Sequence, residues 1–289
     1  MRQLIQNTRV TLEMIKWEHS IFALPFALTG AVLAANGWPS LRVTGLIVLC
    51  MVAARTAAMA FNRLVDAEID AANPRTKMRA LPAGVLRRRF VAGFVVLSGA
   101  GFVVGAALLN RMCLLLSPVA LVIILGYSFA KRFTRWSHLV LGLALGIAPT
   151  AAWIAVRGSL DPRILVLTLA VLLWVAGFDV LYACQDFEHD RNAGLNSIPQ
   201  AFGVRAAFWI ARGLHGLMLL ALISLVFLFG LGPLAMTGIG VTAALLLYEH
   251  SIISPSDLRR LNAAFFTLNG IISVLFFLFV VADVLRRKT

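Results

Sequence analysis

The chain has 289 residues, of which 60% are hydrophobic and only 13% are charged. Soluble domains carry about 25% charged residues, so this composition excludes a soluble domain and predicts an all-α, polytopic membrane protein. The net charge of +13 does not indicate nucleic-acid binding, because the basic residues lie in short segments between apolar runs, where they orient the chain and contact anionic lipid. We therefore expect membrane lipid, and no nucleic acid, as a partner. The sequence gives no indication of an oligomeric state.

Nine apolar runs, each close to the length of about 20 residues that crosses a hydrocarbon core, predict nine transmembrane helices within one domain covering residues 1–289. A basic amphipathic segment, 1–16, precedes them and is expected to lie on the membrane surface. The spans are expected at about 17–36, 41–65, 90–109, 112–130 and 138–156, then from about 164 into the polar residues at 179–190, and at about 206–229, 233–249 and 262–284. Polar loops separate them, the longest at 71–89.

The positions of Lys and Arg predict that the N-terminus lies in the cytoplasm. This orientation places the loops after the second, fourth, sixth and eighth spans inside, together with most of the basic residues. The basic C-terminal tail, Arg286-Arg287-Lys288, argues against an odd number of spans, because nine spans leave it outside. We keep nine, since several basic loops determine orientation more strongly than one terminal segment.

Asn62, Asp66 and Asp70 recur every four residues at the end of the second span. On a helix of about 3.6 residues per turn they fall on one stripe within roughly 80° of each other. Three oxygen-bearing side chains on one face suit a hard divalent cation such as Mg²⁺. The alternative is a merely hydrated helix end, but acidic groups at membrane helices are costly to desolvate and usually functional. We refer to these three residues as the first row.

Asp179, Tyr182, Asp186 and Asp190 form a second row, spaced three, four and four residues apart at the end of the sixth span. Both rows end even-numbered spans, so they open on the same side of the membrane, which is the cytoplasmic side in the predicted orientation. Two such rows facing each other would hold Mg²⁺ ions and, through them, a diphosphate.

These patterns resemble the two aspartate-rich motifs of the UbiA superfamily of intramembrane prenyltransferases, most closely the 4-hydroxybenzoate polyprenyltransferase-like branch. Three further segments are similar to that family, namely Asn73-Pro74-Arg75-Thr76 through Leu81-Pro82-Ala83-Gly84, Tyr127-Ser128-Phe129-Ala130-Lys131-Arg132-Phe133-Thr134, and Ser197-Ile198-Pro199-x-x-Phe202-Gly203. One departure is Arg63, where many members have Asp, and it removes one possible metal oxygen or acceptor.

The resemblance implies a nine-helix bundle in a bacterial-type inner membrane, around a central cavity open to the cytoplasm. It also implies Mg²⁺ as cofactor, a polyprenyl diphosphate donor and a hydroxylated aromatic acid as acceptor. Two acceptors remain open, 4-hydroxybenzoate in ubiquinone synthesis and a hydroxynaphthoate in menaquinone synthesis. Asn62, Asp66 and Asp70 would hold one ion, and Asp186 and Asp190 another. These five are therefore the expected catalytic residues, because a Lewis acid must neutralise the charge on the leaving diphosphate.

Several other side chains are expected to bind substrate. Lys131, Arg132 and Arg79 are candidates for contact with the diphosphate, although they also suit a role as positive-inside anchors. Arg55 lies inside the second span and needs a partner or a watery cavity; the resemblance supports a role in holding a substrate carboxylate or the diphosphate. The remaining candidates are Tyr127 and Tyr182, which suit the diphosphate or the allylic cation, and Asp179, which suits a metal, a neighbouring side chain or the aromatic substrate.

A cation-coupled transporter is the principal alternative of another class, but it predicts acids near mid-bilayer on broken helices rather than beside basic loops. A CDP-alcohol phosphotransferase is disfavoured, because its Asp-Gly and Ala-Arg elements are absent after the first row. Within the same superfamily, acceptors such as haem, chlorophyllide or a glycerol phosphate remain open.

Overall fold

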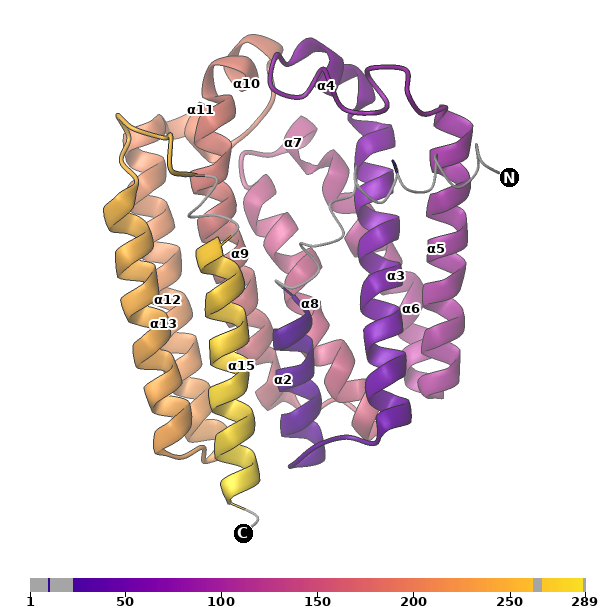
Figure 1. The fold of residues 1–289 in the computed structure, drawn as a ribbon, viewed down its shortest axis with the longest axis vertical. Coiled ribbons are helices and arrows are strands. Elements are labelled where there is room, and N and C mark those ends of the chain that lie inside the picture. The colour runs from indigo at the N-terminus through magenta and orange to yellow at the C-terminus, as the bar shows by residue number, and fades with distance from the viewer. Residues whose placement is uncertain (1–9, 11–22, 262–266, 288–289) are drawn as a thin grey trace.

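The computed structural model describes residue 10 and residues 23–261 and 267–287, and its elements are helices throughout those ranges. The long helices pack side by side, roughly parallel or antiparallel to one another (Figure 1). They are α2 (Leu24–Ala35), α3 (Leu41–Val65), α5 (Arg88–Leu109), α6 (Arg111–Gly126), α8 (Ser137–Arg157), α9 (Leu165–Ala183), α12 (Val204–Phe229), α13 (Pro233–Ile252) and α15 (Asn269–Arg286).

The expectation of an all-α, polytopic membrane protein is confirmed. Among the described residues, seven helical segments are long and apolar enough to cross a membrane. Helix α2, with 12 residues, is a shorter apolar helix, and the 20-residue α13 falls outside the group of seven. The starts of the first and last predicted spans, and the segment 1–16 apart from residue 10, lie outside the described ranges, so the number nine stays a prediction.

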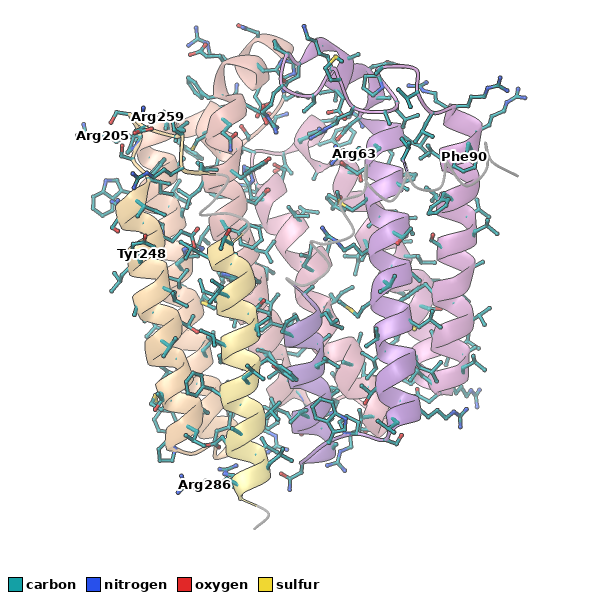
Figure 2. All side chains as sticks on the ribbon, viewed as in Figure 1. Arg63, Phe90, Arg205, Tyr248, Arg259 and Arg286 are labelled. Carbon is teal, nitrogen blue, oxygen red and sulfur yellow. The ribbon has the colours of Figure 1, made fainter. Side chains whose placement is uncertain are left out.

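The loops that follow α3 and α9 meet at one end of the bundle. They contain the short helices α4 (Ala67–Ala72), α10 (Phe187–Ala193) and α11 (Ile198–Phe202), with α7 (Ala130–Phe133) just inside them (Figure 1). Both rows therefore lie at the same end, as their position after even-numbered spans predicts. Figure 2 shows Arg63 near this end and the basic tail residue Arg286 at the opposite end, which agrees with an odd number of crossings.

Helix α9 lies in the centre of the core. Its Trp174 is fully buried, and the ring centroid of Phe26 on α2 lies 5.0 Å from that of the indole. The indole nitrogen donates to Asn269 Oδ1 on α15 over 2.8 Å. Polar groups inside a bilayer need such partners, and interhelical hydrogen bonds of this kind fix neighbouring helices against one another. Asp179 and Tyr182 of the second row are thus carried by a helix that is fixed against α2 and α15.

Close packing of α8 against α9 depends on glycine. A Cβ atom at Gly142 would lie 2.4 Å from the backbone oxygen of Leu172, whereas one at Gly45 on α3 would meet nothing within 4 Å. We expect Gly142→Ala to lower the thermal midpoint in detergent, because forcing atoms into a packed contact costs about 1–3 kcal/mol. Gly45→Ala, the matched control, should be neutral or slightly stabilising, since alanine favours helix by about 1 kcal/mol over glycine. Equal midpoints for the two variants would contradict this account of the α8–α9 contact.

Candidate active site

The first row is built where one helix is interrupted. Helix α3 ends at Val65, and Asp66 (φ −91°, ψ 3°) lies between it and α4. The helical hydrogen bonds continue across the break, from Asp66 N to Asn62 O at 2.9 Å and from Asp70 N to Asp66 O at 2.7 Å. The sequence predicts one helix through the first row, whereas the structure has two, α3 and α4. The three side chains nevertheless keep helical spacing.

Asp66 and Asp70 are buried, with exposed fractions of 3% and 5%. Asn62 Nδ2 donates to Asp66 Oδ2 over 2.9 Å, and Lys131 Nζ reaches the same oxygen over 2.6 Å. Arg79 Nη1 lies 2.7 Å from Asp70 Oδ1 and 2.9 Å from Oδ2. Each buried carboxylate thus has a cationic partner, as a charge removed from water requires.

Two further arginines approach the first row from α3 and α7. Arg132 Nη2 donates to the backbone oxygen of Val65 over 2.8 Å and lies 3.5 Å from Asp66 Oδ1. Arg63 Nη1 lies 3.5 Å from Asp70 Oδ2. Arg63, which departs from the family pattern, therefore supplies a cation beside Asp70 in place of a further metal oxygen.

The second row is met by the loop that follows α4. Asn73 Nδ2 donates to Asp186 Oδ1 over 3.0 Å, although the two residues are 113 positions apart. Arg75 Nε donates to the same oxygen over 2.9 Å, its Nη2 binds the other carboxylate oxygen, and its Nη1 lies 3.3 Å from the Tyr182 hydroxyl. Burial lowers the pKa of the Arg75 guanidinium, but hydrogen bonding and attraction to Asp186 outweigh burial, so its pKa is raised.

The loop therefore joins the two rows, since Arg79 binds Asp70 while Asn73 and Arg75 bind Asp186. Sequence reasoning did not assign a role to Asn73 or Arg75, although both lie in a segment that resembles the family. The feature of the sequence that pointed to Asn73 and Arg75 is their position directly after the first row, where polar and basic residues are grouped. The contacts themselves join segments more than a hundred residues apart, which spacing does not reveal.

Asp190 and Asp179 have different surroundings. Asp190 lies in α10, and the loop before α11 is joined to α7 by a hydrogen bond of 2.7 Å from Asn196 N to Lys131 O. Asp179 lies one turn deeper than Tyr182 and contacts His138 Nδ1 at 2.7 Å. The sequence left three roles open for Asp179. In the structure it contacts a neighbouring side chain, that of His138.

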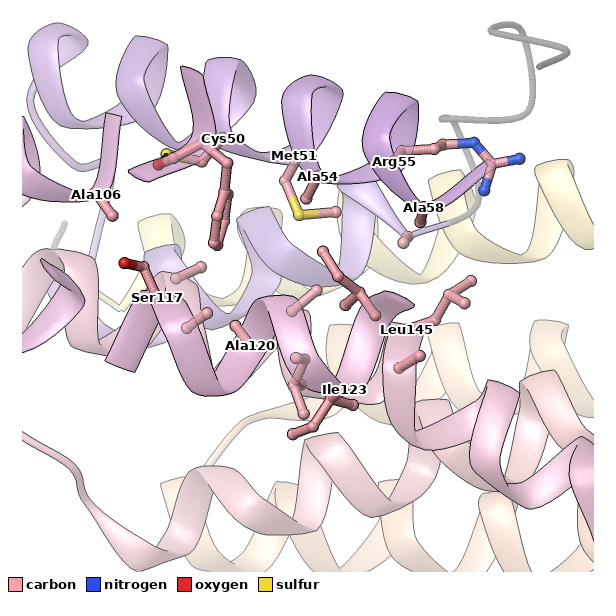
Figure 3. Close-up of a pocket in the computed structure, with 18 of the residues that line it drawn as sticks. Cys50, Met51, Ala54, Arg55, Ala58, Ala106, Ser117, Ala120, Ile123 and Leu145 are labelled. Carbon is pink, nitrogen blue, oxygen red and sulfur yellow. Dashed lines mark hydrogen bonds between the residues drawn. The ribbon is translucent and has the colours of Figure 1, made fainter. Parts of the chain in front are cut away.

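Inward from the rows, a cavity of about 310 Å³ runs between α2, α3, α5, α6 and α8. Its walls are mainly alanine, leucine, isoleucine and methionine. Arg55 lies at the end nearer the rows, and Cys50, Ala106 and Ser117 lie toward the other end (Figure 3). Arg55 Nε is buried and has no hydrogen-bond partner among the described residues. Tyr127 lines the same cavity and its hydroxyl lies 4.0 Å from Met59 Sδ.

The described residues contain no group of three His, Cys, Asp or Glu side chains arranged to hold a metal ion. Lysine and arginine side chains contact the carboxylates instead. The donors are nevertheless suitable, because aspartate and asparagine oxygens are the hard ligands that Mg²⁺ prefers. Asp66 Oδ1 is also buried, and no residue in the described part of the chain hydrogen-bonds it. The two rows fit Mg²⁺ if the lysine and arginine side chains leave the carboxylates and bind another anion, such as a diphosphate.

Comparison with known proteins shows the family of the chain. The profile of the UbiA prenyltransferase family matches residues 23–278. The 4-hydroxybenzoate octaprenyltransferase of Vibrio cholerae is 33% identical over 239 residues, covering 81% of this chain and 82% of the relative. That of Alkalilimnicola ehrlichii is 33% identical over 227 residues, covering 78% of this chain and 77% of the relative.

Solved structures show the same architecture. The apo structure of a UbiA homolog from Aeropyrum pernix superposes with a TM-score of 0.84 at 34% identity, covering 92% of this chain and 98% of that one. A UbiA homolog from Archaeoglobus fulgidus, bound to DMAPP and Mg²⁺, has a TM-score of 0.71 at 21% identity over 95% of this chain and 98% of that one, which shows the shared fold. The chain belongs to the UbiA prenyltransferase family and is a prenyltransferase enzyme.

Proposed function

We propose that this enzyme transfers a polyprenyl group from polyprenyl diphosphate to a hydroxylated aromatic acid, in a Mg²⁺-dependent step of ubiquinone or menaquinone biosynthesis. The acceptor is 4-hydroxybenzoate or a related hydroxynaphthoate. The relatives named 4-hydroxybenzoate octaprenyltransferase favour the first of these. The protein would cross a bacterial-type inner membrane several times, with the two rows facing the cytoplasm.

The observation that carries the choice of acceptor is Arg55. Its guanidinium has a buried nitrogen that none of the described residues hydrogen-bonds, and it lines an apolar cavity at the end nearer the rows. A lone charge inside a membrane helix requires an opposite charge or water. An aromatic acid fits both the charge of Arg55 and the apolar cavity. Its carboxylate matches the planar guanidinium group, and its ring is apolar enough for the cavity.

The diphosphate of the donor would bind at the mouth formed by the two rows. Asn62, Asp66 and Asp70 would hold one Mg²⁺ and Asp186 and Asp190 another, and the metal supplies the Lewis acid that neutralises charge on the leaving group. Lys131, Arg132 and Arg79 already lie at this mouth with their cationic ends on the rows or the adjoining backbone. We infer that they turn to the diphosphate oxygens when donor binds, because charge-assisted hydrogen bonds to phosphate are strong.

In this mechanism the allylic carbon–oxygen bond of the donor breaks and its electron pair stays on the diphosphate. The electron-rich ring carbon of the acceptor then forms a carbon–carbon bond with the allylic carbon, and the ring loses a proton. The Tyr182 and Tyr127 rings are suited to stabilise the allylic cation through their faces.

The proposal is tested with membranes that contain the protein and a labelled polyprenyl diphosphate. We expect label on 4-hydroxybenzoate or a dihydroxynaphthoate in the presence of Mg²⁺, and none after chelation with EDTA. The methyl ester of the acceptor, which lacks the negative charge, should react poorly. Transfer that is indifferent to divalent metal, or that prefers an uncharged acceptor, would contradict the proposal.

A further inference from the structure

One carboxylate of the second row stands apart from the others. Between Leu173 and Leu181, every residue of α9 is buried except Asp179, whose side chain is 23% exposed. Tyr182 follows it by three residues within α9, so helical geometry places these two side chains on one face of that helix. Asp179 is therefore partly exposed on the face of α9 that also carries Tyr182, about one turn deeper in the bundle.

The partner of Asp179 also differs. Asp66, Asp70 and Asp186 each bind a lysine or arginine. The hydrogen bond that the structure gives Asp179 comes from His138, at 2.7 Å between Nδ1 and Oδ2. No ion pair with lysine or arginine involves Asp179 in the described part of the chain, so its charge is not committed to a fixed cation.

The tautomer of His138 follows from its two contacts. The backbone N–H of Ile198 donates to Nε2 over 3.2 Å, so Nε2 is an acceptor and carries no proton. The proton of the neutral ring is then on Nδ1, which donates to Asp179. His138 is 4% exposed and lies in the first turn of α8, so its ring has a fixed orientation. A histidine fixed through one nitrogen orients the group bound to the other.

We propose that His138 is a positioning residue that holds Asp179 as the base for the proton leaving the acceptor ring. After the new carbon–carbon bond forms, the C–H bond at the same ring carbon breaks and its electron pair restores the aromatic ring. The proton passes to Asp179 Oδ1, the oxygen that His138 does not contact, and from there to solvent at the mouth. This inference rests on the proposed function, because it needs an aromatic acceptor whose ring lies beside Asp179.

Two substitutions separate this role from a purely structural one. Asn places its amide nitrogen where His carries Nδ1, so His138→Asn keeps the donor to Asp179 and loses the acceptor for Ile198. Gln places its amide at the position of Nε2, so His138→Gln keeps the acceptor for Ile198 and loses the donor. His138→Ala removes both, and Asp179→Asn removes the base.

We expect Asp179→Asn to lower kcat about 100-fold or more, the size associated with loss of a general base. His138→Ala and His138→Gln should each lower kcat by roughly 10- to 100-fold, as expected when an orienting hydrogen bond is lost. His138→Asn should recover most of that kcat. With an acceptor deuterated at the attacked ring position, Asp179→Asn and His138→Gln should show a larger primary isotope effect than wild type, because proton loss becomes rate-limiting.

The wild-type protein is assayed alongside the variants. If the proposed function is wrong, the wild type transfers no prenyl group to any aromatic acid, and this result is distinct from a failure of the inference about His138 and Asp179. Given wild-type transfer, recovery by His138→Gln with loss in His138→Asn would assign His138 to the support of α11 and overturn the inference. An isotope effect that does not increase in Asp179→Asn would place the base elsewhere and overturn it as well.

Discussion

Asp66→Ala and Asp186→Ala are each expected to abolish prenyl transfer while the protein remains in the membrane. Each substitution would remove a proposed metal ligand on one side of the diphosphate, and it leaves a basic partner, Lys131 or Arg75, without its carboxylate. Loss of one group that stabilises developing charge typically lowers kcat by about 10²–10³-fold. The measurement is initial-rate transfer from labelled donor at saturating Mg²⁺, normalised to the folded protein in each preparation.

Glu68→Ala is the matched control for Asp66→Ala. Glu68 lies in α4 between Asp66 and Asp70, but its side chain is 89% exposed and pairs with Arg88 at the surface. Surface ion pairs contribute about 0–1 kcal/mol, so Glu68→Ala should retain near wild-type turnover. Turnover equal to wild type in Asp66→Ala or Asp186→Ala would remove the two-row mechanism.

Arg55→Leu is expected to lower kcat/KM for the aromatic acid by roughly 30-fold or more, because truncating one partner of a buried charge pair costs about 2–5 kcal/mol. The KM for the polyprenyl diphosphate should be unchanged. Arg55→Lys keeps the charge but loses the planar fork, so its effect should be intermediate. Steady-state kinetics with each substrate varied in turn measures these effects.

The same experiment decides between the two roles that the sequence left open for Arg55. The methyl ester of the acceptor lacks the carboxylate charge, so Arg55→Leu should affect its kcat/KM much less than that of the acid. An increase in the KM for the donor, with acceptor kinetics unaltered, would instead assign Arg55 to the diphosphate.

The apolar spans were predictable because the bilayer imposes a long hydrophobic run on each crossing helix. The span expected at 41–65 coincides with α3, and that at 138–156 agrees with α8 (Ser137–Arg157) to within a residue at each end. The break at Asp66 was not predictable, since the i to i−4 hydrogen bonds of α3 continue across it. The spacing of residues in the sequence indicates which side chains share a helix face, but it does not indicate where a helix is interrupted, as at Asp66.

Helical spacing in the sequence shows which candidate site residues follow one another along a segment, and it does not show which of them meet across the fold. The spacing of Asp186 and Asp190 was visible in the sequence, but the contact of Asp186 with Arg75 joins positions 111 residues apart. His138 carried no signal, because it belongs to no metal-ligand pattern and its partner is 41 residues away. The resemblance to a family identified the segment that contains Arg75, but it did not show that Arg75 contacts Asp186.

The central claim is that the two rows together hold the donor diphosphate through divalent metal. A crystal structure with a non-reactive polyprenyl thiodiphosphate and Mn²⁺, whose anomalous scattering locates the metal, tests it most directly. We predict metal peaks between the diphosphate and the carboxylates of Asp66, Asp70, Asp186 and Asp190, with Lys131 moved from Asp66 to the diphosphate. Donor bound with no metal at any of these four carboxylates would contradict the account.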